Sequence, residues 1–329
     1  MTDSPGEFDL IARCFAPLAG TRRVDALGLG DDAARFVPTP GLELVLTADA
    51  LVAGVHFLPD DPPALIARKA LRVNLSDLAA KGARPVAYLL CLALPADLGG
   101  DWVAAFAGGL AADQMEFGIE LAGGDTTSTP GPLTIAITAI GEIEPGRMLR
   151  RDAARAGDDV WVSGTIGDAA LGLGVLRDGA GAATDGAAAQ ALVARYRLPQ
   201  PRLALGGALA GSGAACMDVS DGLVQDLGHI ARRCGCGAVI DEPAVPLSAA
   251  AADMVARDSR AFDVAVSGGD DYELLFALPP AARDIVQAAS AAAKTPVARI
   301  GRLVPGSGVD LRAADGQLRR LARGGWTHF

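Results

Sequence analysis

The chain has 329 residues, 50% of them hydrophobic and 21% charged, which suffices for a substantial core and is unlike a disordered protein. A formal net charge of −10 at pH 7 argues against a nucleic-acid partner, because proteins that bind phosphate backbones carry a basic surface. The N-terminus lacks the basic start of a signal peptide, and no apolar run reaches the roughly 18 residues of a spanning helix. We therefore expect a cytoplasmic protein with no membrane partner. The five cysteines lack paired C-x-x-C spacing and are expected to be reduced thiols.

In the first half of the chain, the predicted helices and strands follow one another in an irregular order. Apolar residues at helical spacing predict a helix over residues 7–18, and two strands are predicted over 24–29 and 42–47. A Pro-Pro start and a glycine stop predict a helix over 62–81. A strand over 86–94, a helix over 102–117 and a strand over 133–143 complete a first domain of mixed composition.

Residues 145–157 are rich in Gly, Arg and Asp without apolar periodicity, so we place the domain boundary there and divide the chain into 1–147 and 148–329. In the second half, helices are predicted over residues 168–176, 190–196, 223–233 and 281–293, and strands over 159–163, 215–219, 238–240 and 273–278. The alanine- and glycine-rich residues 178–189 are expected to form a loop. Because strands and helices do not alternate strictly, the sequence favours an α+β fold over a doubly wound sheet.

Aspartates beside Gly, Ser or Thr recur at predicted turns and helix starts. They lie in Gly30-Asp31-Asp32-Ala33, Thr47-Ala48-Asp49, Asn74-Leu75-Ser76-Asp77, Gly123-Gly124-Asp125-Thr126, Asp218-Val219-Ser220-Asp221-Gly222 and Gly268-Gly269-Asp270-Asp271-Tyr272-Glu273. Mg²⁺ prefers carboxylate and phosphate oxygens, and several ions on one polyphosphate would need about this supply of aspartates. The set therefore indicates metal-assisted phosphoryl transfer.

Each segment taken alone is also explained as an ordinary turn or helix N-cap. Asp77 departs most from that explanation, since it falls inside an apolar helical pattern where an unpaired carboxylate is costly. No P-loop motif occurs in the sequence. The segment Gly28-Leu29-Gly30-Asp31-Asp32-Ala33 matches a dinucleotide-binding motif, but it would place two aspartates against the phosphates, so we interpret it as a false match. Of the three scattered histidines, only His56, in a predicted exposed loop, is kept as a candidate.

In their order and spacing, these segments resemble the signature of the thiamine-monophosphate kinase family. The resemblance includes Gly54-Val55-His56-Phe57 and the final Gly325-Trp326-Thr327-His328-Phe329, and it covers nearly the whole chain. It implies a two-domain α+β fold like that of aminoimidazole ribonucleotide synthetase. It also implies a homodimer in which the N-terminal domains, residues 1–147, pair into a β-barrel and bind ATP and magnesium.

The resemblance further implies roles for individual residues. Carried over by position, it implies that several Mg²⁺ ions are bound by Asp32, Thr47, Ala48, Asp49, Asp77, Asp125, Asp218 and Asp221, of which Asp77, Asp125 and Asp221 are catalytic. It implies ATP contacts from Gly124, Asp125, Arg151 and Ser220, and thiamine phosphate contacts from His56, Asp270 and Trp326. Two residues depart from those common in the family: Ala48 offers only a backbone oxygen, and Asp270 reaches less far than glutamate.

The reaction implied is attack of a phosphate oxygen of thiamine monophosphate on the γ-phosphorus of ATP, which gives thiamine diphosphate and ADP. A phosphate monoester has a second pKa of about 6, so the nucleophile is already ionised at neutral pH without a strong general base. Two alternatives stay open. One is another enzyme of the superfamily, such as selenophosphate synthetase, whose reactive cysteine in a Gly-rich N-terminal loop this sequence lacks. The other is a nucleotide or cation sensor without turnover.

Overall fold

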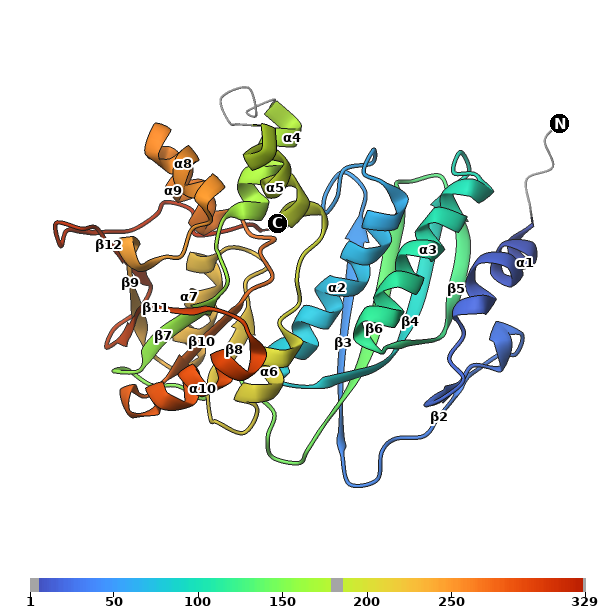
Figure 1. The fold of residues 1–329 in the computed structure, drawn as a ribbon, viewed down its shortest axis with the longest axis horizontal. Coiled ribbons are helices and arrows are strands. Elements are labelled where there is room, and N and C mark those ends of the chain that lie inside the picture. Colours follow the sequence, from blue (N-terminus) through green and yellow to red (C-terminus); the bar gives the residue numbers. More distant parts are fainter. Residues whose placement is uncertain (1–5, 179–185, 328–329) are drawn as a thin grey trace. The chain divides into compact units, whose positions relative to one another are not determined.

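The computed structural model describes residues 6–178 and 186–327, and the chain divides into two compact units (Figure 1). The first unit comprises Met1–Leu78 and Ala83–Pro145, and the second comprises Ala79–Gly82 and Gly146–Phe329. Both units mix helices with strands, as an α+β fold requires. Within the described residues, none of the helices combines the length and the apolar content needed to cross a membrane.

The first unit is built on a four-stranded sheet in the order β3-β6-β4-β5, with helices α2 and α3 on one of its faces (Figure 1). Only β4 and β5 run parallel. The elements are α1 (Glu7–Leu10), a π-helical turn (Ile11–Phe15), a 3₁₀ turn (Ala16–Leu18), β1 (Val24–Asp25), β2 (Arg35–Phe36), β3 (Glu43–Val52), α2 (Pro63–Lys81), β4 (Arg84–Pro95), α3 (Gly100–Phe117), β5 (Glu120–Thr129) and β6 (Thr134–Ile143).

Helices α2 and α3 approach each other closely because one of the contact residues has no side chain. A Cβ on Gly109 would lie 2.2 Å from the carbonyl oxygen of Ala64, so only glycine fits there. Next to this contact, the buried Arg72 binds Asp113 at 2.8 Å and Glu116 at 2.6 Å. Because the guanidinium is desolvated, its charge has to be paired, and the ion pairs fix the register of the two helices.

The opposite face of this sheet carries exposed apolar side chains. Successive residues of a strand point to opposite faces, and on β3 the buried Val45 alternates with Leu44 and Leu46, which are 40% and 63% exposed. Leu89 on β4 is also 40% exposed. The unit therefore presents a second apolar surface that its own helices do not cover.

The second unit contains a seven-stranded sheet in the order β13-β12-β9-β11-β7-β10-β8, in which only β12 and β9 pair in parallel. Its strands are β7 (Asp159–Ser163), β8 (Ala215–Asp218), β9 (Gly237–Asp241), β10 (Leu274–Leu278), β11 (Val297–Val304), β12 (Val309–Arg312) and β13 (Leu318–Arg319). Its helices are α4 (Asp168–Asp178), α5 (Gly186–Arg197), α6 (Leu203–Leu209), α7 (Leu223–Arg233), α8 (Ala249–Arg257), α9 (Arg260–Ser267) and α10 (Arg283–Ala293).

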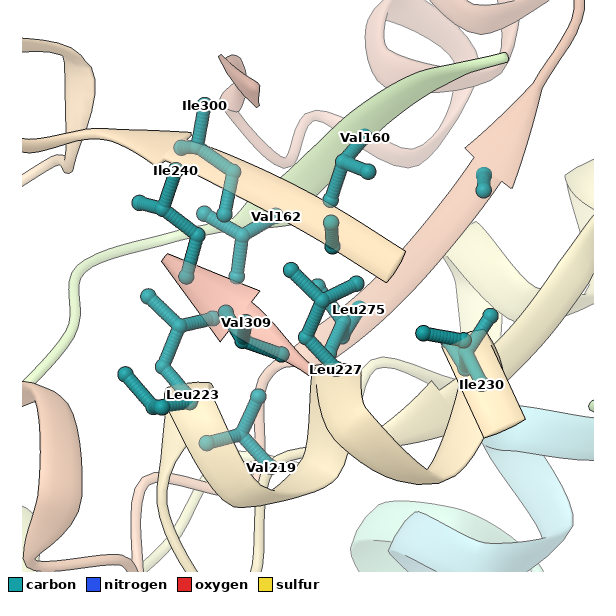
Figure 2. Close-up of a cluster of buried hydrophobic side chains, with 14 of the residues drawn as sticks. Val160, Val162, Val219, Leu223, Leu227, Ile230, Ile240, Leu275, Ile300 and Val309 are labelled. Atoms are coloured by element: carbon teal, nitrogen blue, oxygen red, sulfur yellow. The ribbon is translucent and has the colours of Figure 1, made fainter. Parts of the chain in front are cut away.

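Helix α7 packs on one face of this sheet. Figure 2 shows its residues Leu223, Leu227 and Ile230, spaced at i, i+4 and i+7, against strand residues that include Val160 and Leu275. The alternate strand residues Trp161, Cys216 and Phe276 belong to a separate buried cluster with residues of α6 and α10. This core holds the first turn of α7 in place, directly after strand β8.

The structure corrects several predicted elements. The strand expected over residues 24–29 ends at Asp25, because Leu27, Gly28 and Leu29 take positive φ values and form a 3₁₀ turn. The helix expected over 7–18 is divided among three short helical segments. The loop expected over 178–189 is wrong at both ends, where α4 reaches Asp178 and α5 begins at Gly186; residues 179–185 lie outside the described part. The helices expected over 62–81 and 223–233 are confirmed as α2 and α7.

Candidate active site

The first candidate group lies on the helix-facing side of β3. Thr47 and Asp49 occupy alternate positions of this strand, and the Thr47 hydroxyl donates a hydrogen bond to Asp77 on α2. Asp77 is only partly buried, while the residues around it from Lys69 to Ala80 are buried. Burial and the charge of Asp77 raise the pKa of Asp49 to about 6. The two carboxylates thus stand in a place where a cation would relieve their repulsion.

The sequence predicted that Asp49 and Asp125 lie in turns, and the structure contradicts this prediction. Asp49 lies in the middle of β3 and Asp125 in the middle of β5, because both stretches continue the strand pairing of the sheet. Ala48 lies between Thr47 and Asp49 and is exposed on the opposite side of the strand. Its methyl group therefore takes no part in the group formed by Thr47, Asp49 and Asp77.

A second candidate group surrounds a cavity of about 380 Å³ in the first unit. Asp31, Asp32, Gly124 and Asp125 line it together with apolar residues such as Leu90. Gly124 has a φ of 153°, and a Cβ there would lie 1.7 Å from the carbonyl oxygen of Leu90. A residue with a side chain would therefore clash with the paired strand β4 here, so this point of the cavity wall requires glycine. The structure thus brings Asp32, Gly124 and Asp125 together.

His56 lies in the turn after β3 and is partly buried, whereas the sequence predicted an exposed loop. Its ring nitrogen Nδ1 accepts a hydrogen bond from the backbone N–H of Val52 at 3.0 Å. Because Nδ1 is an acceptor, the neutral imidazole carries its proton on Nε2. The turn thus fixes the tautomer of His56 with a donor at Nε2.

The third candidate group lies at the carboxyl end of β8 in the second unit. Asp218 ends this strand and is 3% exposed, and Ser220 and Asp221 follow in the turn that leads into α7. Asp226 on the first turn of α7 accepts hydrogen bonds at Oδ2 from the backbone N–H groups of Asp221 and Gly222, at 3.1 and 3.2 Å. The carboxylate of Asp226 therefore holds the shape of the turn that carries Asp221.

This turn could also hold a metal ion. Among the residues described, one ligand atom each of Asp221, Asp226 and His229 lie within 4.8 Å of one another. Asp226 is 1% exposed, and its second oxygen, Oδ1, has no hydrogen-bond partner. Burial, followed by the charges of Asp221 and Asp218, raises the pKa of Asp226 well above its ordinary value. A concentration of negative charge with an unsatisfied buried oxygen fits a cation with oxygen ligands.

The loop before β10 lies directly against this turn. The backbone N–H groups of Asp270 and Tyr272 donate to the carbonyl oxygens of Ser220 and Val219, both at 2.8 Å. A Cβ on Gly269 would lie 2.3 Å from the Ser220 oxygen, so the two loops are in direct backbone contact. Asp270 itself has a φ of 66°, in the left-handed region. The structure therefore holds Asp270 next to Ser220 in a conformation that is unusual for a residue with a side chain.

Two buried carboxylates anchor this loop. Asp271 accepts hydrogen bonds from the backbone N–H groups of Gly167 and Ala169, at the start of α4. Glu273 is fully buried and binds Arg195 at 2.9 Å and Arg202 at 2.5 Å. The part of the loop that follows Asp270 is thus tied to α4, α5 and the segment before α6, and Asp270 is the aspartate that the loop presents beside Ser220.

Trp326, which is 45% exposed, is joined to the same turn through its backbone, since its N–H donates to the carbonyl oxygen of Asp221 at 2.9 Å. Arg151 is exposed and lies near α7, where its charge, after burial and the charge of Arg232, contributes to a lowered pKa of His229. The second unit therefore gathers the candidates Asp218, Ser220, Asp221, Asp270 and Trp326 around one turn. His328 and Phe329 of the predicted terminal motif lie outside the described residues.

Asp226 is not among the residues predicted from the sequence, although its position in the sequence pattern is unusual for an acidic residue. Asp226 falls between Leu223 and Leu227 on the apolar face of α7. Asp77 was selected as a candidate because it too is an acidic residue inside an apolar helical pattern, and the same criterion would have selected Asp226. Glu273 had no comparable signal, because its partners Arg195 and Arg202 are more than 70 residues away in the sequence.

Comparison with known proteins identifies the family to which the chain is related. Models of AIR synthase related protein match residues 30–143 as the N-terminal domain and residues 155–314 as the C-terminal domain. Thiamine-monophosphate kinase of Caulobacter vibrioides is 43% identical, over 98% of this chain and 91% of its own length. The crystal structure of thiamine-monophosphate kinase from Stenotrophomonas maltophilia K279a is 44% identical, with a TM-score of 0.79 and coverage of 88% of this chain and 90% of its own. The structure of AaThiL complexed with AMPPCP and TMP is 33% identical, with a TM-score of 0.77 and coverage of 89% of each chain.

The fold and the two domain matches define a protein with the two-domain architecture of AIR synthase related proteins. The resemblance inferred from the acidic segments is confirmed by relatives that match nearly the whole chain. The chain belongs to the thiamine-monophosphate kinase family.

Proposed function

We propose that the chain transfers the γ-phosphoryl group of ATP to thiamine monophosphate and forms thiamine diphosphate and ADP. The observation that carries this proposal is the pair Asp49 and Asp77, in which burial and like charge raise the pKa of one carboxyl to about 6. Two carboxylates held this close repel each other, and a cation beside them would relieve that repulsion, as in a kinase whose phosphates arrive with metal ions. The relatives named thiamine-monophosphate kinase supply the substrate class.

The residues present fit Mg²⁺, because the candidate set supplies hard oxygen ligands from carboxylates, one hydroxyl and one backbone carbonyl. Asp32, Thr47, Ala48, Asp49, Asp77 and Asp125 would hold ions in the first unit, and Asp218 and Asp221 in the second. When bound, Mg²⁺ would neutralise the charge that the two polyanionic substrates bring together. Asp77, Asp125 and Asp221 are the carboxylates on which catalysis would depend.

Other residues would bind and orient the two substrates. Gly124, which lines the cavity beside Asp125, would contact ATP through its backbone. Ser220 and Arg151 would contact ATP, and the permanent charge of Arg151 would balance phosphate oxygens. His56 would donate from Nε2 to the thiamine phosphate, with Asp270 and Trp326 as further contacts, Trp326 by stacking on an aromatic ring.

In the reaction, a phosphate oxygen of thiamine monophosphate forms a bond to the γ-phosphorus of ATP while the bond from that phosphorus to the β,γ-bridging oxygen breaks. The electron pair of the broken bond leaves with ADP. The attacking oxygen is ionised at neutral pH, because the second pKa of a phosphate monoester is about 6. No side chain of the chain therefore has to act as a strong base, and the work of the protein is alignment and charge balance.

We also propose that the chain forms a homodimer in which the four-stranded sheets of two copies pair into a barrel. The exposed apolar residues Leu44, Leu46 and Leu89 support this, because they lie on the sheet face that α2 and α3 do not cover. Leu46→Glu places a charge on this face and should convert the dimer to monomer in light scattering coupled to size exclusion. Leu318→Glu, at a leucine of β13 that is 58% exposed, is the matched control and should leave the mass unchanged. An unchanged mass for Leu46→Glu would remove this face as the dimer contact.

The proposed function is tested by ADP release in the presence of ATP and Mg²⁺. We expect turnover with thiamine monophosphate and none with thiamine or aminoimidazole ribonucleotide precursors. Asp77→Asn should lower kcat at least about 100-fold, as loss of a charged group that stabilises the transition state does. Asp97→Asn, at an exposed aspartate outside the candidate groups, should act like wild type. Turnover with another acceptor, or nucleotide binding without turnover, would overturn the proposal while leaving the fold intact.

A further inference from the structure

The last residues of the described chain are built against the turn that carries Asp221. The N–H of Trp326 donates to the carbonyl oxygen of Asp221 at 2.9 Å, and the N–H of Gln225 donates to the carbonyl oxygen of Gly324 at 3.1 Å. Between these two bonds, a Cβ on Gly325 would lie 2.6 Å from the Asp221 oxygen and 2.5 Å from the Cβ of Gln225. The C-terminal segment is therefore in direct backbone contact with the start of α7.

The side chain of Gln225 joins both partners of this contact. Its Nε2 donates to the carbonyl oxygen of Trp326 at 2.5 Å and to Oδ2 of Asp221 at 3.3 Å. A primary amide has two N–H donors, so one group can serve both acceptors at once. One of these acceptors belongs to a carboxylate proposed to bind metal, and the other to the residue proposed to stack on the thiamine phosphate.

We infer that Gln225 is a positioning residue that couples the Asp221 carboxylate to the Trp326 backbone. The inference rests on the proposed function, since it assigns these two acceptors to the metal and to the substrate. The bond to Oδ2 limits rotation of the Asp221 side chain. The bond to the Trp326 carbonyl holds the C-terminal segment, whose Gly325 has no side chain that could anchor it. Loss of one amide should therefore affect the metal and the acceptor substrate together.

The test replaces Gln225 by Met, which has similar length and volume but no N–H donor. In this variant, KM for thiamine monophosphate and the Mg²⁺ concentration at half-maximal rate should each rise about threefold to tenfold, the range for one lost hydrogen bond. Trp326→Ala should raise KM for thiamine monophosphate and leave the Mg²⁺ dependence near that of wild type. Gln317→Met is the matched control, because Gln317 is exposed and its side chain forms none of the hydrogen bonds to Asp221 or Trp326; it should match wild type in both values.

A second readout does not depend on activity. Hydrogen exchange of the Trp326 amide, whose N–H is bound to the Asp221 oxygen, should speed up at least about threefold in Gln225→Met and stay unchanged in Gln317→Met. A lower melting temperature without a change in KM, Mg²⁺ dependence or Trp326 exchange would make Gln225 merely structural and overturn the inference. Wild-type protein that does not phosphorylate thiamine monophosphate would refute the proposed function instead, and the exchange measurement would still decide whether Gln225 holds the C-terminal segment.

Discussion

Glu273 offers a direct test of how the loop that carries Asp270 is held. Its carboxylate is fully buried and is bound by the hydroxyl of Ser163, by Arg195 and by Arg202, the last through both Nε and a terminal nitrogen. Glu273→Gln keeps the volume of the side chain but removes its charge. The two guanidinium groups, each less than one quarter exposed, would then face each other without compensation.

Removing one partner of a buried ion pair costs about 3–5 kcal/mol, because the remaining charge stays buried. For a folding unit of this size, each kcal/mol lowers the melting temperature by about 2–4 °C. We therefore expect a decrease of about 6–20 °C for Glu273→Gln in thermal unfolding followed by circular dichroism. KM for thiamine monophosphate should also rise, since Asp270 lies three residues before Glu273.

Asp253→Asn is the control for this experiment. Asp253 forms an ion pair with Arg257 at 2.7 Å, one turn apart on α8, with both side chains roughly half exposed. Exposed pairs of this kind contribute about 0.3–0.5 kcal/mol, so its melting temperature should change by no more than about 2 °C. If Glu273→Gln shifted the melting temperature no further than Asp253→Asn, the buried network would not be the anchor of the loop.

Three further predictions concern the first unit. Asp49→Asn should stabilise the metal-free protein at pH 8 by about 1–3 kcal/mol. The reason is that the pKa of Asp49 is raised in the folded state, so ionisation of this carboxyl lowers the stability as the pH rises toward and through about 6. Equal stability of variant and wild type in urea unfolding at pH 8 would contradict this. Glu142 behaves in the opposite way: despite its burial, hydrogen bonds from Thr39 and Arg23 hold its pKa below 4.5, so its contribution is present above pH 4.5 and is lost as pH falls below it. Glu142→Gln should therefore be less stable than wild type by about 3–5 kcal/mol at pH 7, with a smaller difference at pH 3; a difference independent of pH would refute the assignment. Gly124→Ala should destabilise the protein by at least about 2 kcal/mol in the same assay and abolish ATP binding in calorimetry, since the added Cβ would overlap the Leu90 carbonyl; normal binding would show that the cavity wall can move.

The sequence allowed the family, the mixed fold and most of the long helices to be predicted, because these depend on local spacing and on ordered motifs. Asp125 was predicted to lie in a turn, because Gly-Gly-Asp-Thr has the composition of a turn. In the structure this segment is part of strand β5, because it pairs with β4. The grouping of Asp32 with Asp125, or of Asp221 with Trp326, depends on contacts between segments about 90 to 105 residues apart. No local pattern encodes such contacts, so the motifs named the candidate residues but not their neighbours.

The last residues of helix α2 belong to the second unit, although the rest of the helix belongs to the first. The helix belongs to the first unit up to Leu78, whereas Ala79 and Ala80 are part of a buried cluster with Leu149 and Leu205 in the second. The fit is so close that a Cβ on Gly206 would lie 1.9 Å from the carbonyl oxygen of Ala79. A gene cut near residue 146 would therefore separate the C-terminal unit from a piece of its own interior. A C-terminal fragment that begins near residue 146 is therefore expected to expose the apolar surface that Ala79 and Ala80 cover in the whole chain.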